Sequence, residues 1–81
     1  MPYIDKDRRV EIDSGESPET PGELNYLLTS LCLDYIALAP AVSYGLLNEV
    51  VGVLESVKLE FYRRVVAPYE DKKMLDNGDV Y

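Results

Sequence analysis

The chain is short and acidic: it has 81 residues, a net charge of −7, one cysteine (Cys32) and no histidine. A chain of this length forms one small domain, which buries only about 60% of its unfolded surface and usually needs a further source of stability. One thiol without any histidine excludes an intrachain disulfide and a zinc site. We therefore expect oligomerisation to supply that stability.

The charges are unevenly distributed. All eight basic residues lie within Lys6–Arg9 or Lys58–Lys73, and residues 10–57 contain eight acids and no base. General binding to duplex nucleic acid requires a broad basic surface, so we expect no duplex partner. No apolar run reaches the length of a membrane span, and no secretion signal opens the chain. We therefore expect no membrane partner and a cytoplasmic location.

The start of the fold is predicted at Thr20. Residues 1–19 form a polar N-terminal segment in which residues 5–11 favour one helical turn, and the helical domain is expected over residues 20–81. Thr20 can cap a helix, and Pro21 suits the first helical position. Glu23 stands where a capping box requires a carboxylate.

Two main helices follow, from Pro21 to about Ala39 and from Tyr44 to about Ala67. Pro40 ends the first helix, and the short link after it predicts an antiparallel helical hairpin. The residue before a proline disfavours helix, so a break or kink is expected at Ala67–Pro68. A short third helix is then expected from about Tyr69 to Leu75. The predicted fold is all-α: a helical hairpin with a short C-terminal helix, assembling into an oligomeric bundle.

The second main helix has more apolar surface than one partner helix covers. At 100° per residue its apolar side chains fill an arc of about 180°, whereas a single partner requires about 100°. This surplus predicts self-assembly, most simply as a dimer. The residues expected at the interface between subunits are Tyr26, Leu33, Gly52, Ser56 and Leu59.

One basic and aromatic cluster is a candidate ligand site. Its members are Lys58, Tyr62, Arg63, Arg64 and Tyr69. Arginine presents a planar fork that suits phosphate or carboxylate, and tyrosine can stack on a planar ligand. The alternative is ordinary ion pairing within the chain. The acids available for it are Glu55, Glu60, Glu70 and Asp71.

Catalysis has little support in the sequence, and no catalytic residue, metal ligand or cofactor is expected. The carboxylates of Glu23 on the first main helix and of Glu49, Glu55 and Glu60 on the second resemble those of all-helical nucleotide pyrophosphatases. That family holds magnesium with E-x-x-E and E-x-x-D pairs on antiparallel helices. Here Glu49 is followed three residues later by Gly52, and Glu23 is followed by Tyr26, so both pairs are incomplete. Cys32 has no histidine to activate it and is expected to be structural.

From Thr20 onward the chain resembles a group of short uncharacterised proteins of tailed phages, prophages and some bacteria and archaea. The matching segments are Glu23–Tyr26, Asn48–Glu55, Lys58–Arg64, Pro68–Asp71 and Asn77–Tyr81. The resemblance implies a phage or prophage accessory protein of helical build, which acts in the cytoplasm of the host cell.

The function expected from these observations is that of a non-enzymatic oligomer that binds a small ligand. Its sharper form is the sequestration of an anionic nucleotide that serves as an immune signal, by analogy with other small phage proteins. Two alternatives stay open. One is a module that binds a host protein through its acidic surface, and the other is a divergent pyrophosphatase-like protein.

Overall fold

The structure is a computed structural model that describes residues 3–81, and every regular element in that range is a helix. The all-α class predicted from the sequence is therefore confirmed, with no strand between residues 3 and 81. The described chain divides into two compact units: unit 1 ends at Ser43, and unit 2 comprises Tyr44–Tyr81.

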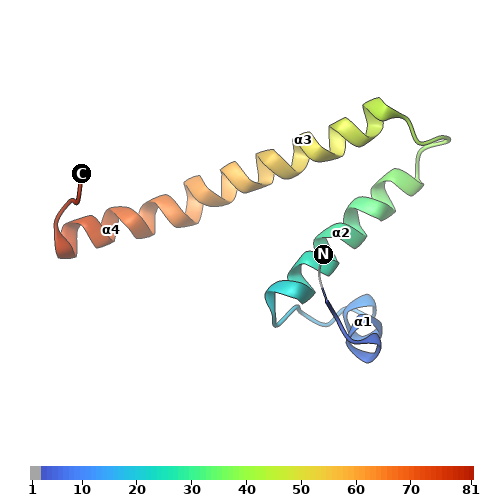
Figure 1. The fold of residues 1–81 in the computed structure, drawn as a ribbon, viewed down its shortest axis with the longest axis horizontal. Coiled ribbons are helices and arrows are strands. Elements are labelled where there is room, and N and C mark those ends of the chain that lie inside the picture. The colour runs from blue at the N-terminus through green and yellow to red at the C-terminus, as the bar shows by residue number, and fades with distance from the viewer. Residues whose placement is uncertain (1–2) are drawn as a thin grey trace. The chain divides into compact units, whose positions relative to one another are not determined.

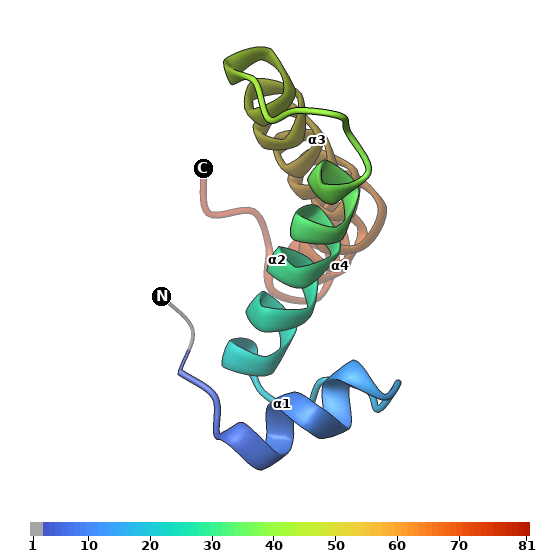
Figure 2. The ribbon, with the colours of Figure 1, turned by 90° about the vertical axis from the view of Figure 1, so that its right-hand side faces the viewer.

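Unit 1 contains α1 (Lys6–Asp13) and α2 (Pro21–Ala37), and α1 lies across the beginning of α2 (Figure 2). The eight residues of α1 make it longer than the single turn expected from the sequence. After α1 the chain turns at Gly15, whose φ of 109° is a conformation that side chains with a Cβ rarely adopt. Ile12 of α1 is only 3% exposed and is the one buried apolar side chain among the described residues.

The start of α2 follows the sequence prediction. The Thr20 hydroxyl oxygen accepts a hydrogen bond from the backbone N–H of Glu23 at 3.1 Å, and proline occupies the first turn. The helix ends at Ala37, two residues before the predicted end. Leu38 and Ala39 still donate backbone hydrogen bonds to carbonyls three residues earlier, which is the tighter spacing common in a last turn.

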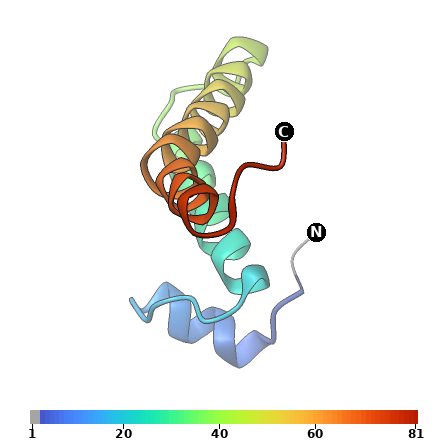
Figure 3. The same ribbon diagram turned by 90° about the vertical axis from the view of Figure 1, so that its left-hand side faces the viewer.

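Unit 2 is one continuous helical stretch followed by a short tail (Figures 1 and 3). It begins with α3 (Tyr44–Phe61), continues through the π-helical segment η1 (Tyr62–Val66), and ends with α4 (Ala67–Asn77). At η1 the N–H of Ala67 bonds to the carbonyl of Tyr62, five residues earlier. Gly78, with a φ of 83°, follows α4 at the stop expected from the sequence.

Of the break or kink predicted at Ala67–Pro68, the break is wrong, because the helix continues through Pro68 into α4. Proline has no N–H, and its ring clashes with the carbonyl four residues earlier in a regular α-helix. A π turn holds one more residue than an α turn, so η1 changes the hydrogen-bond register just before Pro68. The chain therefore accommodates the proline by widening one turn and not by ending the helix.

Most apolar side chains of α2 and α3 are exposed. On α3, Leu54, Val57 and Phe61 are 42%, 49% and 60% exposed, respectively. On α2, Leu28 and Leu31 are 40% and 57% exposed. No helix among residues 3–81 has the length and apolar character needed to cross a membrane.

Candidate functional site

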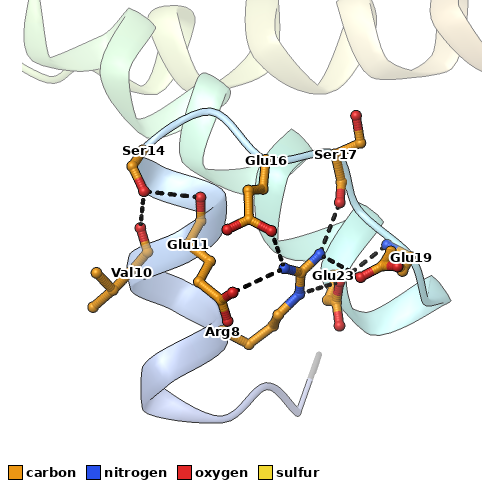
Figure 4. Close-up of polar contacts among 8 residues, drawn as sticks. All are labelled: Arg8, Val10, Glu11, Ser14, Glu16, Ser17, Glu19 and Glu23. Carbon is orange, nitrogen blue, oxygen red and sulfur yellow. Dashed lines mark hydrogen bonds and ion pairs between the residues drawn. The ribbon is translucent and has the colours of Figure 1, made fainter.

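The most highly connected polar side chain is Arg8, on α1 (Figure 4). Its Nε donates to Glu23 Oε1 on α2 at 2.8 Å, and its Nη1 donates to Glu16 Oε1 at 3.0 Å. Its Nη2 donates to the backbone carbonyl of Ser17 at 2.8 Å. One guanidinium therefore holds together α1, the loop that follows it and the first turn of α2, as its planar set of five N–H donors allows.

Two further carboxylates complete this arrangement, which we call the Arg8 cluster: Arg8, Glu11, Glu16, Glu19 and Glu23. Glu19 lies 3.1 Å from Nη2 of Arg8, and Glu11 lies 3.7 Å from Nη1. The side chains of Arg8 and Glu23 are only 16% and 12% exposed. This cluster was not predicted from the sequence. Arg8 and Glu23 are fifteen residues apart, and no helical or strand periodicity relates two residues at that separation across a loop.

The Arg8 cluster shifts the pKa values of its members in opposite directions. The pKa of Glu23 is lowered, first because its carboxylate accepts the backbone N–H of Glu19 at 3.0 Å, and also because it accepts from Arg8. The pKa of Arg8 is raised, chiefly by its hydrogen bond to Glu23. The pKa of Glu11 is raised, first by the negative charge of Glu16. Glu23 is therefore stabilised as an anion, whereas ionised Glu11 is repelled.

A second feature of unit 1 is an open pocket of about 500 Å³ between α1 and α2. The residues that line it are Ile12, Asp13, Tyr26, Leu27, Ser30, Leu31, Leu33 and Asp34. The Tyr26 hydroxyl donates to Asp13, with its oxygen 2.9 Å from Oδ1 and 3.1 Å from Oδ2. This contact raises the pKa of Tyr26. Tyr26 and Leu33, both predicted at a subunit interface, thus lie at the same pocket.

The predicted ligand residues lie at the end of α3, in η1 and in α4, and three of them contact acids. Lys58 Nζ lies 3.0 Å from Glu55 Oε1, and Arg64 Nε lies 3.4 Å from Glu60 Oε1. The Tyr62 hydroxyl donates to Glu70 Oε1 at 3.1 Å, which raises the pKa of Tyr62. These are the contacts of the ion-pairing alternative, although all the ionic groups involved are solvent-exposed, where such pairs contribute little.

The other two predicted ligand residues differ from these three. The ring of Tyr69 has the Lys73 ammonium 5.5 Å from its centre, a cation–π distance. Arg63 is exposed, and no hydrogen bond or ion pair of its side chain occurs within residues 3–81. Arg63 is therefore the one member of the predicted site whose guanidinium is available to an anion. Whether these five residues bind a ligand stays a prediction.

Comparison with protein families identifies the family of this chain. The model of a domain of unknown function, DUF6899, matches residues 1–80. The chain belongs to the DUF6899 family. The match includes the polar N-terminal segment, whereas the resemblance noted from the sequence began at Thr20. Neither the comparison with curated proteins nor that with solved structures finds a match.

The carboxylates of this DUF6899 domain that resembled a magnesium site are mostly paired with bases. Glu23 contacts Arg8, Glu55 contacts Lys58, and the Glu60 carboxylate accepts from Arg64. Among residues 3–81 no group of three or more acidic, cysteine or histidine side chains is placed to hold a metal ion.

The remaining interface residues predicted for this DUF6899 domain lie on α3. Gly52 and Ser56 are exposed, and Leu59 is 58% exposed. A Cβ built on Gly52 would have no atom within 4 Å among the described residues. The chain itself therefore gives no steric reason for a glycine at this position, and the interface assignment stays a prediction.

Proposed function

We propose that this protein is a non-enzymatic binding protein that assembles with further copies of itself through the apolar face of α3. The observation that carries the proposal is the exposure of Leu54, Val57 and Phe61 on successive turns of one helix. Large contiguous apolar patches are rare on monomeric soluble proteins and mark interaction sites. Antiparallel packing of α2 against α3 as a hairpin is part of the same proposal.

The charges of unit 2 support a second copy as the partner. Residues 44–57 of α3 contain the acids Glu49 and Glu55 and no base, whereas all five bases of unit 2 lie within Lys58–Lys73. Parallel pairing of two such helices would place the basic segments side by side. Antiparallel pairing places each acidic segment beside a basic one, which favours association with a copy in that direction.

The assembly is tested by analytical ultracentrifugation of the wild type and of Leu54→Ala. If a partner buries Leu54, the truncation weakens the assembly by about 2–5 kcal/mol per buried side chain. Leu75→Ala is a matched control, because Leu75 is 87% exposed on α4. A wild type that sediments as a folded monomer at micromolar concentration refutes self-assembly. In that case a host protein becomes the partner for the apolar face.

We further propose that the assembly binds an anionic nucleotide, in keeping with a phage or prophage accessory protein that acts in the host cytoplasm. The supporting observation is Arg63, whose guanidinium is unpaired within the described chain and lies in the π-helical segment. Single π turns are frequent at functional sites. Lys58, Tyr62, Arg64 and Tyr69 lie near it in sequence, so one copy supplies several of the predicted ligand residues.

The nucleotide proposal is tested by calorimetry against a panel of cyclic and ADP-ribose-type nucleotides. Arg63→Ala is expected to abolish binding and to leave thermal stability nearly unchanged, because the exposed Arg63 side chain has no hydrogen bond or ion pair within residues 3–81 that the variant would remove. Lys72→Ala, which removes the same charge from α4, is the control and is expected to retain binding. Absence of binding by the wild type across the panel refutes this part of the proposal.

A further inference from the structure

The pocket between α1 and α2 is lined by apolar side chains and two carboxylates, and the proposed assembly assigns no role to this combination. The pocket volume of about 500 Å³ falls within the range of small-ligand pockets. Leu27, Leu31 and Leu33 supply apolar surface, and Asp13 and Asp34 supply carboxylates. No lining residue is basic. Pockets of this kind typically combine apolar walls with a few polar groups that fix the orientation of a ligand.

The two carboxylates of the pocket differ in their hydrogen bonding. Asp13 accepts the Tyr26 hydroxyl through both of its oxygens and is thereby held in place. Asp34 is exposed, and its side chain has no hydrogen bond or ion pair within residues 3–81. One carboxylate is thus oriented and the other is available, in a pocket without an internal counter-charge.

The surroundings strengthen the negative potential of the pocket. Residues 1–43 contain eight acids and three bases. Arg8 is engaged in the Arg8 cluster, so its charge is already balanced. Arg9, whose charge acts weakly on Tyr26, is exposed and does not line the pocket. A cleft lined by one sign of charge concentrates ions of the opposite sign.

We propose that this pocket binds an alkylammonium group. The ammonium pairs with the carboxylates of Asp34 and Asp13, and the alkyl chain lies on Leu27, Leu31 and Leu33. This chemistry is shared by free aliphatic amines and by the lysine side chain of a partner protein. A neutral alcohol of the same length lacks the charge, and a carboxylate ligand is repelled by the two aspartates.

The proposal is tested on the full chain by two-dimensional ¹H–¹⁵N NMR titration with n-hexylamine at pH 7. We expect saturable shifts at the amides of Leu27, Leu31 and Leu33, and binding of n-hexanol at least about tenfold weaker. Asp34→Asn is expected to reduce the amine affinity by about two- to fivefold, since Asp34 is exposed. Asp5→Asn is the matched control, because it removes one charge from the same unit and its side chain makes no cap hydrogen bond.

The outcomes separate the proposal from a general attraction of cations to an acidic protein. Equal binding of hexylamine and hexanol, or equal losses in Asp34→Asn and Asp5→Asn, overturns it. Titration with 1,5-diaminopentane and with Nα-acetyl-lysine amide then distinguishes the sources. Tighter binding of the diamine indicates a free amine as the ligand, and tighter binding of the lysine amide indicates a partner side chain. The absence of shifts with all three amines also overturns the proposal.

Discussion

Arg8 Nε and Glu23 Oε1 lie 2.8 Å apart and connect α1 to the first turn of α2. The two residues are fifteen positions apart and are the least exposed charged side chains of the Arg8 cluster. The burial of Ile12 and the hydrogen bond from Tyr26 to Asp13 connect α1 to α2 as well. The polar N-terminal segment is thus part of a compact unit without having an apolar face.

The first prediction concerns the geometry of Arg8. Arg8→Lys keeps the charge but replaces a planar fork of five donors by one ammonium, which cannot bond Glu23, Glu16 and the Ser17 carbonyl together. We expect faster hydrogen exchange at the α1 amides while α3 is unchanged. Arg9→Lys is the matched control, since Arg9 is exposed and lies outside the cluster. Equal exchange rates in the two variants would contradict the role given to Arg8.

The second prediction concerns acid unfolding of unit 1. The pKa of Glu23 is lowered in the fold, so its contribution to stability is present above the ordinary carboxyl pKa. That contribution is lost as the pH falls through the lowered pKa. Glu23→Gln should therefore destabilise unit 1 at pH 7 and weaken the dependence of its stability on acid pH.

The third member of the Arg8 cluster with a shifted pKa, Glu11, is expected to affect stability in the opposite direction to Glu23. Its pKa is raised, first by Glu16, so its ionisation costs stability as the pH rises through the raised pKa. Glu11→Gln should therefore leave unit 1 as stable as the wild type or more stable at pH 7. Thermal unfolding of both variants between pH 3 and pH 7, followed by circular dichroism, measures the change in stability that each substitution causes. Destabilisation of equal size by both substitutions would contradict the assignment.

The starts and ends of the helices in each unit were largely predictable from short sequence signals. The Thr20 cap, Pro21 at the helix start and Gly78 at the end of α4 all follow from backbone requirements that a few residues meet by themselves. In contrast, the Glu23 carboxylate accepts from the N–H of Glu19 and not from that of Thr20, as a regular capping box would require. That difference depends on the path of the preceding loop, which the sequence does not reveal.

Two kinds of feature were not predicted from the sequence. One kind depends on contacts between residues far apart in sequence, and the other depends on whether the helix breaks or continues at Pro68. The Arg8 cluster and the pocket beside Tyr26 require α1 to dock on α2, and α1 has no apolar periodicity that predicts docking. Pro68 correctly indicated a disturbance of the helix. A proline ends a helix or widens one of its turns, depending on how many backbone hydrogen bonds form when the helix continues past it. The rule for the residue before a proline considers only neighbouring residues and does not weigh the hydrogen bonds of α4.

The third prediction concerns Pro68. Pro68→Ala restores an N–H that can bond the carbonyl of Arg64 and removes the ring that would clash with that carbonyl in a regular α-helix. We expect η1 to revert to regular α-helix, with a stability gain of about 1–3 kcal/mol for unit 2. Circular dichroism at 222 nm and thermal unfolding measure this change. Pro18→Ala, in the loop of unit 1, should lower stability slightly because it adds freedom to the unfolded chain. An unchanged unfolding midpoint in Pro68→Ala would contradict this explanation of η1.

The fourth prediction uses two glycines with different surroundings. A Cβ on Gly22 would lie 2.9 Å from the backbone oxygen of Tyr3, so Gly22→Ala should destabilise unit 1. At Gly52 no atom of another part of residues 3–81 lies within 4 Å of a built Cβ, so Gly52→Ala should raise helix stability by about 0.5–1 kcal/mol in an isolated chain. If a second copy packs closely at Gly52, the same substitution weakens association instead. Unfolding at several protein concentrations separates these effects.

Native mass spectrometry of the wild-type protein across a dilution series measures self-assembly. We expect a complex of at least twice the 9.2 kDa mass of the chain that dissociates on dilution, and earlier in Leu54→Ala than in Leu75→Ala. The same spectra would show any retained small molecule as added mass. A 9.2 kDa species alone at micromolar concentration, with the helical circular dichroism intact, would refute self-assembly.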